Sequence, residues 1–230
     1  MKKSQQVLSI IISVTVIVIL LITSFEIGAY SDYGWYEKTY VKYNVLEELN
    51  MEMADVMHVT KEMMSYLRGN RADLVVLINV DGIEREFFND REKAHMIDVK
   101  NLFVSGLWIR RIAVCLLCVA IIVLIKIKAD WKRVLLKSFL VGLGSIIGIT
   151  AGAGILFMSD FNKYFTLFHK VFFTNDLWLL DPRTDLLIRM LPEGFFLDMV
   201  TRIGIIFLIF LSVGVVIGII ALHRYRNKNN

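Results

Sequence analysis

The sequence predicts an all-α membrane protein, a bundle of four transmembrane helices with a small extracytoplasmic α+β cap between helices 1 and 2. Hydrophobic residues make up 56% of its 230 residues and the mean hydropathy is +0.59, which is too apolar for a soluble protein. Four apolar runs are long enough to span a membrane. The net charge of +4 is therefore interpreted by its position in loops, and no stretch interleaves basic and aromatic residues as a nucleic-acid groove requires.

The first apolar run covers residues 7–25, follows Lys2 and Lys3, and is just long enough to cross the hydrocarbon core. A secretory signal peptide also begins with positive charge and an apolar core. This core is long, however, and no small-residue cleavage site follows it. We therefore predict that it is retained as the first transmembrane helix.

Residues 30–101 form the predicted cap, which begins with an aromatic cluster suited to a membrane interface. Residues 40–67 have apolar side chains at helical spacing and predict one long amphipathic helix. Its methionines could face acyl chains or fill a core, and a surface or structural role is expected for His58. Residues 74–80 and 83–88, separated by an Asp-Gly dipeptide, predict a β-hairpin.

The stretch after the hairpin combines a helix start with three titratable side chains. Asn89 can cap a helix, and Glu92 stands three residues on, where a capping box places its acid. Glu92, His95 and Asp98 then lie at i, i+3 and i+6, so both carboxylates are within a turn of the imidazole. A carboxylate beside histidine fixes its tautomer and raises its basicity, as a general base requires. The alternative is a solvated first helical turn with favourably placed acids.

The second span is predicted at residues 102–125, because residues 112–125 alone would cover only about 21 Å against roughly 30 Å of hydrocarbon. Arg110 and Arg111 then lie in the outer part of the span, where a charge is expensive and marks a candidate site. They could bind an anionic headgroup, pair with acids of the cap, or snorkel to the interface. In a continuous helix His95 would lie about 10 Å above the span.

Basic loops indicate which side of the membrane faces inward. Residues 126–133 are rich in lysine and arginine, as are both chain ends, so the two termini and this loop are predicted to be cytoplasmic. The third and fourth spans, residues 134–157 and 203–222, carry glycines at four-residue spacing, which allows close helix packing in lipid. The cap and residues 158–202 are then extracytoplasmic.

The second outer segment, residues 158–202, is dense in aromatic residues and is predicted to lie in the membrane interface. It contains His169, on the same side as His95, so the two histidines could act as base and acid. Two other readings remain: a non-catalytic receptor or assembly factor, and a metal-dependent membrane hydrolase that also uses His58. The scattered histidines lack the close spacing of zinc sites, so we expect neither a metal nor another cofactor.

Four motifs of the outer segments carry a resemblance. They are Arg91-Glu92-x-x-His95-Met96-x-Asp98-Val99, Phe168-His169-x-x-Phe172-Phe173, Trp178-Leu179-Leu180-Asp181-Pro182 and Leu191-Pro192-Glu193-x-Phe195-Phe196. In combination, and with the four-span plan along nearly the whole chain, they resemble the bacterial lipoprotein intramolecular transacylase family. The resemblance implies an enzyme of the bacterial cell membrane that moves the sn-2 acyl chain of a diacylglyceryl-cysteine lipoprotein to the cysteine α-amine. The product is an N-acyl S-monoacylglyceryl, or lyso-form, lipoprotein.

The family's two essential histidines fall on His95 and His169. An α-amine with a pKa near 7.7 to 8.0 is largely protonated at neutral pH and needs a base before it can attack an ester. We assign the base to His95, oriented by Glu92 or Asp98, and the proton donor for the leaving glycerol oxygen to His169, although the roles could be swapped. No covalent acyl-enzyme is required, because both reactants belong to one molecule.

The substrate implied by the resemblance is a diacylglyceryl-modified lipoprotein held among membrane lipids at the outer face. The side chains considered for contact with it are Arg110, Arg111, Trp178 and Asp181.

Overall fold

The computed structural model describes residues 3–80, 83–127, 142, 146, 152 and 159–229. The predicted third span, residues 134–157, lies outside the described residues except for three isolated positions, as does most of the predicted loop 126–133. The chain divides into two compact units, which are described separately below. The first comprises Met1–Gly28, Leu107–Ile155 and Thr201–Asn230, and the second comprises Ala29–Gly106 and Leu156–Val200.

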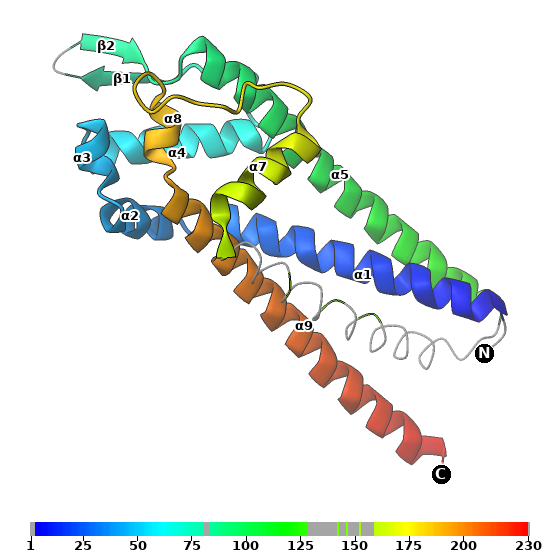
Figure 1. Cartoon of the computed structure of the whole chain (residues 1–230). Coiled ribbons are helices and arrows are strands. Elements are labelled where there is room, and N and C mark those ends of the chain that lie inside the picture. Colours follow the sequence, from blue (N-terminus) through cyan, green and yellow to red (C-terminus); the bar gives the residue numbers. More distant parts are fainter. Residues whose placement is uncertain are drawn as a thin grey trace. The chain divides into compact units, whose positions relative to one another are not determined.

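Three long apolar helices characterise the protein as an integral membrane protein. They are α1 (Lys3–Tyr30), α5 (Asp90–Lys126) and α9 (Glu193–Asn229) (Figure 1). At a rise of about 1.5 Å per residue each exceeds the roughly 30 Å of a bilayer core. The predicted spans 7–25, 102–125 and 203–222 lie within these three helices. The helix α5 is continuous from Asp90 to Lys126. This is the condition under which His95 was expected about 10 Å above the second span.

The first unit consists of the apolar parts of these helices. Most of their large side chains point outward; Ile10, Val119 and Ile217 are each more than half exposed. Such a surface suits lipid, because every backbone polar group is satisfied within its own helix. Between α1 and α9 the helices approach closely, since a Cβ at Gly28 would lie 2.7 Å from Cγ1 of Ile203. A larger side chain than glycine at this position would therefore push the two helices apart.

The second unit surrounds a hydrophobic core of its own. Its helices are α2 (Tyr33–Lys42), α3 (Val45–Leu49), α4 (Met53–Leu67), α7 (Phe161–Phe172) and α8 (Leu186–Met190), together with the first turns of α5 and α9. The core side chains come from all parts of the unit and include Tyr36, Tyr40, Val56, Met63, Phe87, Phe88, Met96, Leu187, Met190 and Phe195. The two outer segments of the sequence therefore fold together as one body.

The prediction of one helix over residues 40–67 is wrong. Asn44 and Asn50 have φ of 53° and 52°, in the left-handed region, and each ends a helical segment. Asparagine tolerates this conformation better than other side chains with a Cβ, so the chain turns twice without a glycine. The methionines Met57 and Met63 are buried, which makes them part of the core and not a surface for acyl chains.

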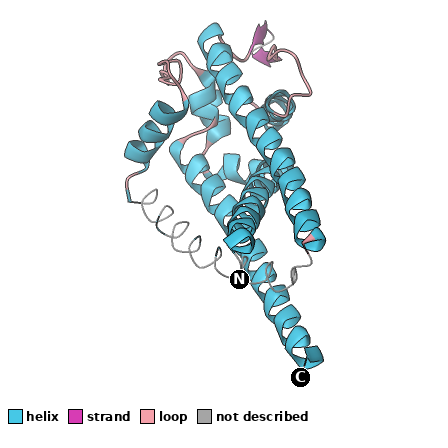
Figure 2. Ribbon diagram, turned by 90° about the vertical axis from the view of Figure 1, so that its right-hand side faces the viewer, coloured by secondary structure: helices cyan, strands magenta, loops and turns pink. Residues whose placement is uncertain are grey.

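The predicted hairpin is present, with shorter strands than expected. Strands β1 (Leu77–Val80) and β2 (Ile83–Glu86), magenta in Figure 2, form a two-stranded sheet. They pair antiparallel, with Leu77 opposite Glu86. The Asp-Gly dipeptide between them lies outside the described residues. After β2, Phe87 and Phe88 are buried in the core, and the chain enters α5 one residue later. The hairpin thereby fixes where α5 begins.

Candidate active site

The start of α5 has the predicted capping box. The backbone N–H of Asn89 donates to Oε2 of Glu92 over 2.7 Å, and the N–H of Glu92 donates to Oδ1 of Asn89 over 2.9 Å. Glu92 is fully buried, and its Oε1 accepts from the N–H of Leu187 over 2.6 Å. Burial raises the pKa of the Glu92 carboxyl, which these backbone donors oppose. Glu92 thus joins α5 to α8 and makes no hydrogen bond to His95.

The second predicted carboxylate is also bonded elsewhere. Oδ2 of Asp98 accepts from Nδ2 of Asn175 over 2.8 Å, and Nη2 of Arg91 donates to the carbonyl of Asp176 over 2.6 Å. These two bonds hold the chain that follows α7 against α5. The charge of Asp98 still favours the protonated form of His95, without a hydrogen bond. Asp98 therefore acts on the imidazole of His95 through the electrostatic attraction of its charge.

The two histidines singled out by the sequence lie together in the second unit. His95 is on α5, seven residues before the predicted span, and His169 is on α7. Their ring centroids are 6.0 Å apart and their planes are inclined by 37°. Both are buried, with 7% and 6% of their surface exposed. Side chains that are far apart in the sequence thus form one buried pair.

Aromatic rings enclose this pair. Trp178 stacks on His169 with centroids 4.8 Å apart and an angle of 29°, and the ring of Phe165 lies 4.1 Å from it. Phe173 contacts both histidines, with centroids 5.5 Å from His95 and 5.4 Å from His169. Such apolar walls exclude water from the imidazoles. The sequence motifs include Trp178 and Phe173 but not Phe165, although Phe165 stands one helical turn before His169.

Burial in this enclosure favours neutral histidines. It lowers the pKa of His95 to about 4, with His169 and Arg91 adding in the same direction and Asp98 opposing them. Burial also lowers the pKa of His169, which a hydrogen bond to the carbonyl of Phe165 opposes. At neutral pH both rings are therefore uncharged.

The tautomer of His169 follows from its hydrogen bond. Its Nδ1 lies 2.7 Å from the carbonyl oxygen of Phe165, one turn earlier on α7. Because a carbonyl only accepts, Nδ1 carries the proton and Nε2 presents a lone pair. For His95, the buried Nδ1 has no hydrogen-bond partner among the described residues. The pair thus contains one defined acceptor and one buried nitrogen without a hydrogen-bond partner in the described part of the chain.

The two predicted arginines belong to the first unit. Arg110 forms an ion pair with Glu26 of α1, and the guanidinium of Arg111 lies 4.7 Å from the ring centroid of Trp108. The first span predicted from the sequence, residues 7–25, ends one residue before Glu26, so this partner of Arg110 was not predicted. The only signal was a lone acid at the end of an apolar run. Both arginines have protein partners that account for their position in an apolar segment.

Asp181 lies in a polar loop before α8. Its carboxylate pairs with Arg183 over 2.6 Å, which lowers the pKa of Asp181 to about 2. Its N–H donates to Oδ2 of Asp185 over 2.7 Å, and Asp185 also accepts from Nδ2 of Asn89 over 2.8 Å. Asp185 is 3% exposed and was not identified from the sequence. It connects this loop to the capping box of α5.

Among the residues that the structure describes, no three histidine, cysteine or acidic side chains lie close enough together to hold a metal ion. His58 is exposed on α4, whereas His95 and His169 are buried. The arrangement is that of an integral membrane protein whose second unit contains a neutral histidine pair in an apolar enclosure, suited to proton transfer.

A comparison with protein families identifies the family of this membrane protein. The model of the lipoprotein intramolecular transacylase Lit family matches residues 10–196, and the chain belongs to this family. It is therefore an acyltransferase of lipoprotein maturation, as the resemblance implied. A comparison with curated proteins gave no match.

Solved structures agree with the fold. The chain is similar to the membrane integral lipoprotein intramolecular transacylase Lit from Bacillus cereus, with a TM-score of 0.71 at 21% identity, covering 99% of this chain and 96% of that one. Two structures of that protein with one histidine replaced, by arginine or by alanine, have TM-scores of 0.76 at 20% identity. They cover 98% and 97% of this chain and 95% and 96% of theirs.

Proposed function

We propose that the chain moves the sn-2 acyl chain of a diacylglyceryl-cysteine lipoprotein to the cysteine α-amine, by acid–base catalysis at His95 and His169. The observation that carries this proposal is the buried pair of neutral imidazoles with ring centroids 6.0 Å apart. The replaced histidine in two structures of the Bacillus cereus relative fits a role for histidine in the family. The product is a lyso-form lipoprotein.

The apolar enclosure prepares the nucleophile. A free α-amine has a pKa near 7.7 to 8.0, and burial disfavours its charged form, as it does for the histidines. Desolvation among Phe165, Phe173 and Trp178 therefore supplies the neutral amine without a strong base. Once the nitrogen begins to bond to the ester carbon its remaining protons become acidic, and an imidazole with a lowered pKa suffices to take one.

We assign the base to His169, the reverse of the order first chosen from the sequence. Its Nδ1–H is held by the Phe165 carbonyl, so Nε2 is free to accept a proton. His95 then serves the leaving group. The amine loses one proton through the pair to the sn-2 oxygen, the C–N bond forms, the C–O ester bond breaks, and both histidines end neutral. No acyl-enzyme intermediate is needed.

Three neighbouring residues act through the histidines. Glu92 fixes the start of α5, which carries His95, by accepting two backbone N–H groups. Asp98 stabilises a proton on His95 through its charge. Trp178 stacks on His169 and shields it from water. We propose positioning roles for all three, and none of them supplies the reacting proton.

The histidine pair is proposed to face the outside of a bacterial cell membrane. The basic residues at both chain ends and in residues 126–133 favour the cytoplasm, which leaves residues 30–101 and 158–202 outside. Diacylglyceryl lipoproteins are anchored in membrane lipids, so an outer site beside the bilayer gives access to both ester and amine. Arg110 and Arg111 are not needed as substrate contacts in this scheme, because each has a protein partner.

The test is mass spectrometry of the N-terminal lipopeptide of one lipoprotein, from cells with a diacylglyceryl background that express the chain or lack it. We expect an unchanged total mass and fragments with one acyl chain on the cysteine nitrogen. His95→Gln and His169→Gln should abolish the transfer, and His58→Gln, at an exposed site, should not. Identical lipopeptides with and without the chain would refute the proposal, as would full transfer by either active-site variant.

A further inference from the structure

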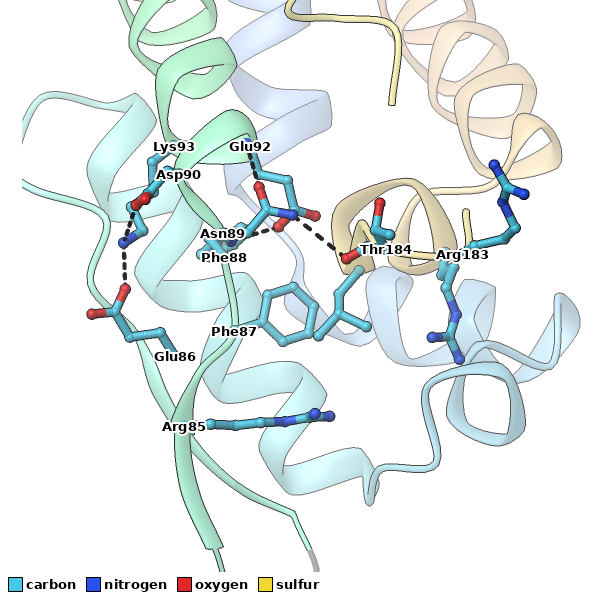
Figure 3. A pocket seen from close by; sticks show the side chains of 12 residues that line it. Arg85, Glu86, Phe87, Phe88, Asn89, Asp90, Glu92, Lys93, Arg183 and Thr184 are labelled. Carbon is cyan, nitrogen blue, oxygen red and sulfur yellow. Dashed lines mark hydrogen bonds and ion pairs between the residues drawn. The ribbon is translucent and has the colours of Figure 1, made fainter. Parts of the chain in front are cut away.

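A cavity of about 580 Å³ lies at the start of α5 and contains neither histidine of the pair. Three segments line it: the end of β2 with the two residues after it, the first turn of α5, and the loop and helix around α8 (Figure 3). Phe87 and Phe88, which belong to the core, form apolar lining. Four cationic side chains line it, namely Arg85, Lys93, Arg183 and Arg189, together with the acids Glu86, Asp90 and Glu92. The cavity thus combines an apolar floor with charged side chains of both signs from separate elements.

One of these cations is available for a ligand. Three of the four are paired with acids, in the contacts Lys93–Glu86, Arg183–Asp181 and Arg189–Glu48. Arg85 is exposed on β2, and its guanidinium makes no ion pair or hydrogen bond within the described part of the chain. Figure 3 shows its side chain extending beside Phe87 along the cavity. An unpaired guanidinium at the edge of an apolar floor favours a carboxylate partner.

The order of the cavity, His95 and the predicted span along α5 indicates which part of a substrate lies near the cavity. Asn89 and Lys93 line it, His95 follows, and the predicted span begins seven residues after His95. At about 1.5 Å per residue, Asn89 is roughly 9 Å from His95, on the side away from the span. A polypeptide that leaves His95 on the side away from the span runs toward the start of α5, where the cavity lies. About three extended residues cover that distance, at roughly 3.3 Å each.

We propose that this cavity binds the first residues of the substrate polypeptide after the lipidated cysteine, and that Arg85 selects acidic side chains there. The inference rests on the proposed transacylase function and adds a preference for peptide sequence to it. The apolar floor accepts the peptide backbone and small side chains. The guanidinium of Arg85 donates hydrogen bonds to the carboxylate of the third or fourth residue. Membrane lipids hold the acyl chains, so the cavity recognises the protein part of the substrate.

The experiment uses the purified full chain in detergent and three synthetic diacylglyceryl-cysteinyl peptides. The peptides differ only at the third and fourth residues, which are two aspartates, two serines or two lysines. The rate of N-acylation is measured for each by mass spectrometry. We expect the acidic peptide to exceed the basic one by about fivefold in kcat/KM, the size of a favourable exposed ion pair. Arg85→Ala should bring this ratio close to one, and Arg85→Lys should keep most of it.

A matched control distinguishes a local effect from the charge of the whole protein. Lys61→Ala removes one exposed positive charge from α4, away from the cavity lining, and should preserve the acidic preference. Equal rates for the three peptides in the wild-type protein would overturn the inference while leaving the transacylase function intact. An acidic preference that survives Arg85→Ala would also overturn it. Failure of every peptide to react would instead refute the proposed function, and the inference with it.

Discussion

The burial of His95 makes the stability of the protein depend on pH, and one substitution should remove this dependence. In the unfolded chain the histidine has its ordinary pKa of 6.5, whereas in the fold the pKa is lowered to about 4. Between these values the unfolded chain binds more protons, so the free energy of unfolding falls as the pH falls. At about 1.4 kcal/mol per pKa unit, the loss from neutral pH to about pH 4 is about 3 kcal/mol. Above pH 6.5 there is no loss.

The test compares His95→Gln with the wild-type protein in mixed detergent micelles, by denaturant unfolding at several pH values. Glutamine does not titrate, so the variant should lack this part of the acid-induced loss, while the contribution of His169 stays in both proteins. His58→Gln, at an exposed position, should behave like the wild type. Equal pH dependence in His95→Gln and the wild type would refute a neutral, buried His95.

Three further predictions concern the surroundings of the site and the ion pair of the first unit. Trp178→Ala should admit water to the imidazole of His169 and raise its pKa, which moves the acid limb of the pH–rate profile to higher pH. Trp178→Phe should leave the acid limb in place. An acid limb that Trp178→Ala does not move would contradict the enclosure. Asn89→Ala should lower the free energy of unfolding by about 1 kcal/mol, measured by denaturant. Asn89→Asp should lower it further, because the new carboxylate faces the buried carboxylate of Asp185. The opposite order would contradict the hydrogen bond between Asn89 and Asp185. Arg110→Gln and Glu26→Gln should each destabilise by about 2 kcal/mol, and the double variant by less than their sum, whereas strict additivity would argue against the pair.

Local features of the site could be predicted from the sequence because neighbouring residues determine them. The capping box of Asn89 and Glu92 depends on a three-residue spacing, and both of its hydrogen bonds are present. The hairpin depends on two short strands around a turn dipeptide. The start of the second span at residue 102 followed from the length that a span requires, and residues 102–125 lie within α5.

Features that depend on distant contacts were missed. The spacing of Glu92 and His95 suggested a carboxylate–imidazole pair, but backbone donors from Asn89 and Leu187 take both carboxylate oxygens instead. The first helix of the cap breaks at Asn44 and Asn50 because periodicity does not report a left-handed residue. Such contacts and breaks are set by tertiary packing and not by residue spacing.

The proximity of the two histidines is also set by tertiary packing. The sequence placed His95 and His169 in outer segments on one side of the membrane, without fixing a distance between them. Their separation of 6.0 Å depends on how α7 and the loop after it pack on α5, through contacts such as Arg91 with the carbonyl of Asp176. The carbonyl that fixes the tautomer of His169 comes from the same helix, one turn away.

The central claim is an intramolecular transfer catalysed by the histidine pair. The most direct measurement incubates the purified chain with two lipopeptides, one with a deuterated sn-2 acyl chain and the other with an isotopically heavy peptide. We predict that every N-acylated product keeps the combination of labels of its own substrate, and that His169→Gln forms no product. Products that carry the deuterated chain on the heavy peptide would contradict the claim, because they require transfer between molecules.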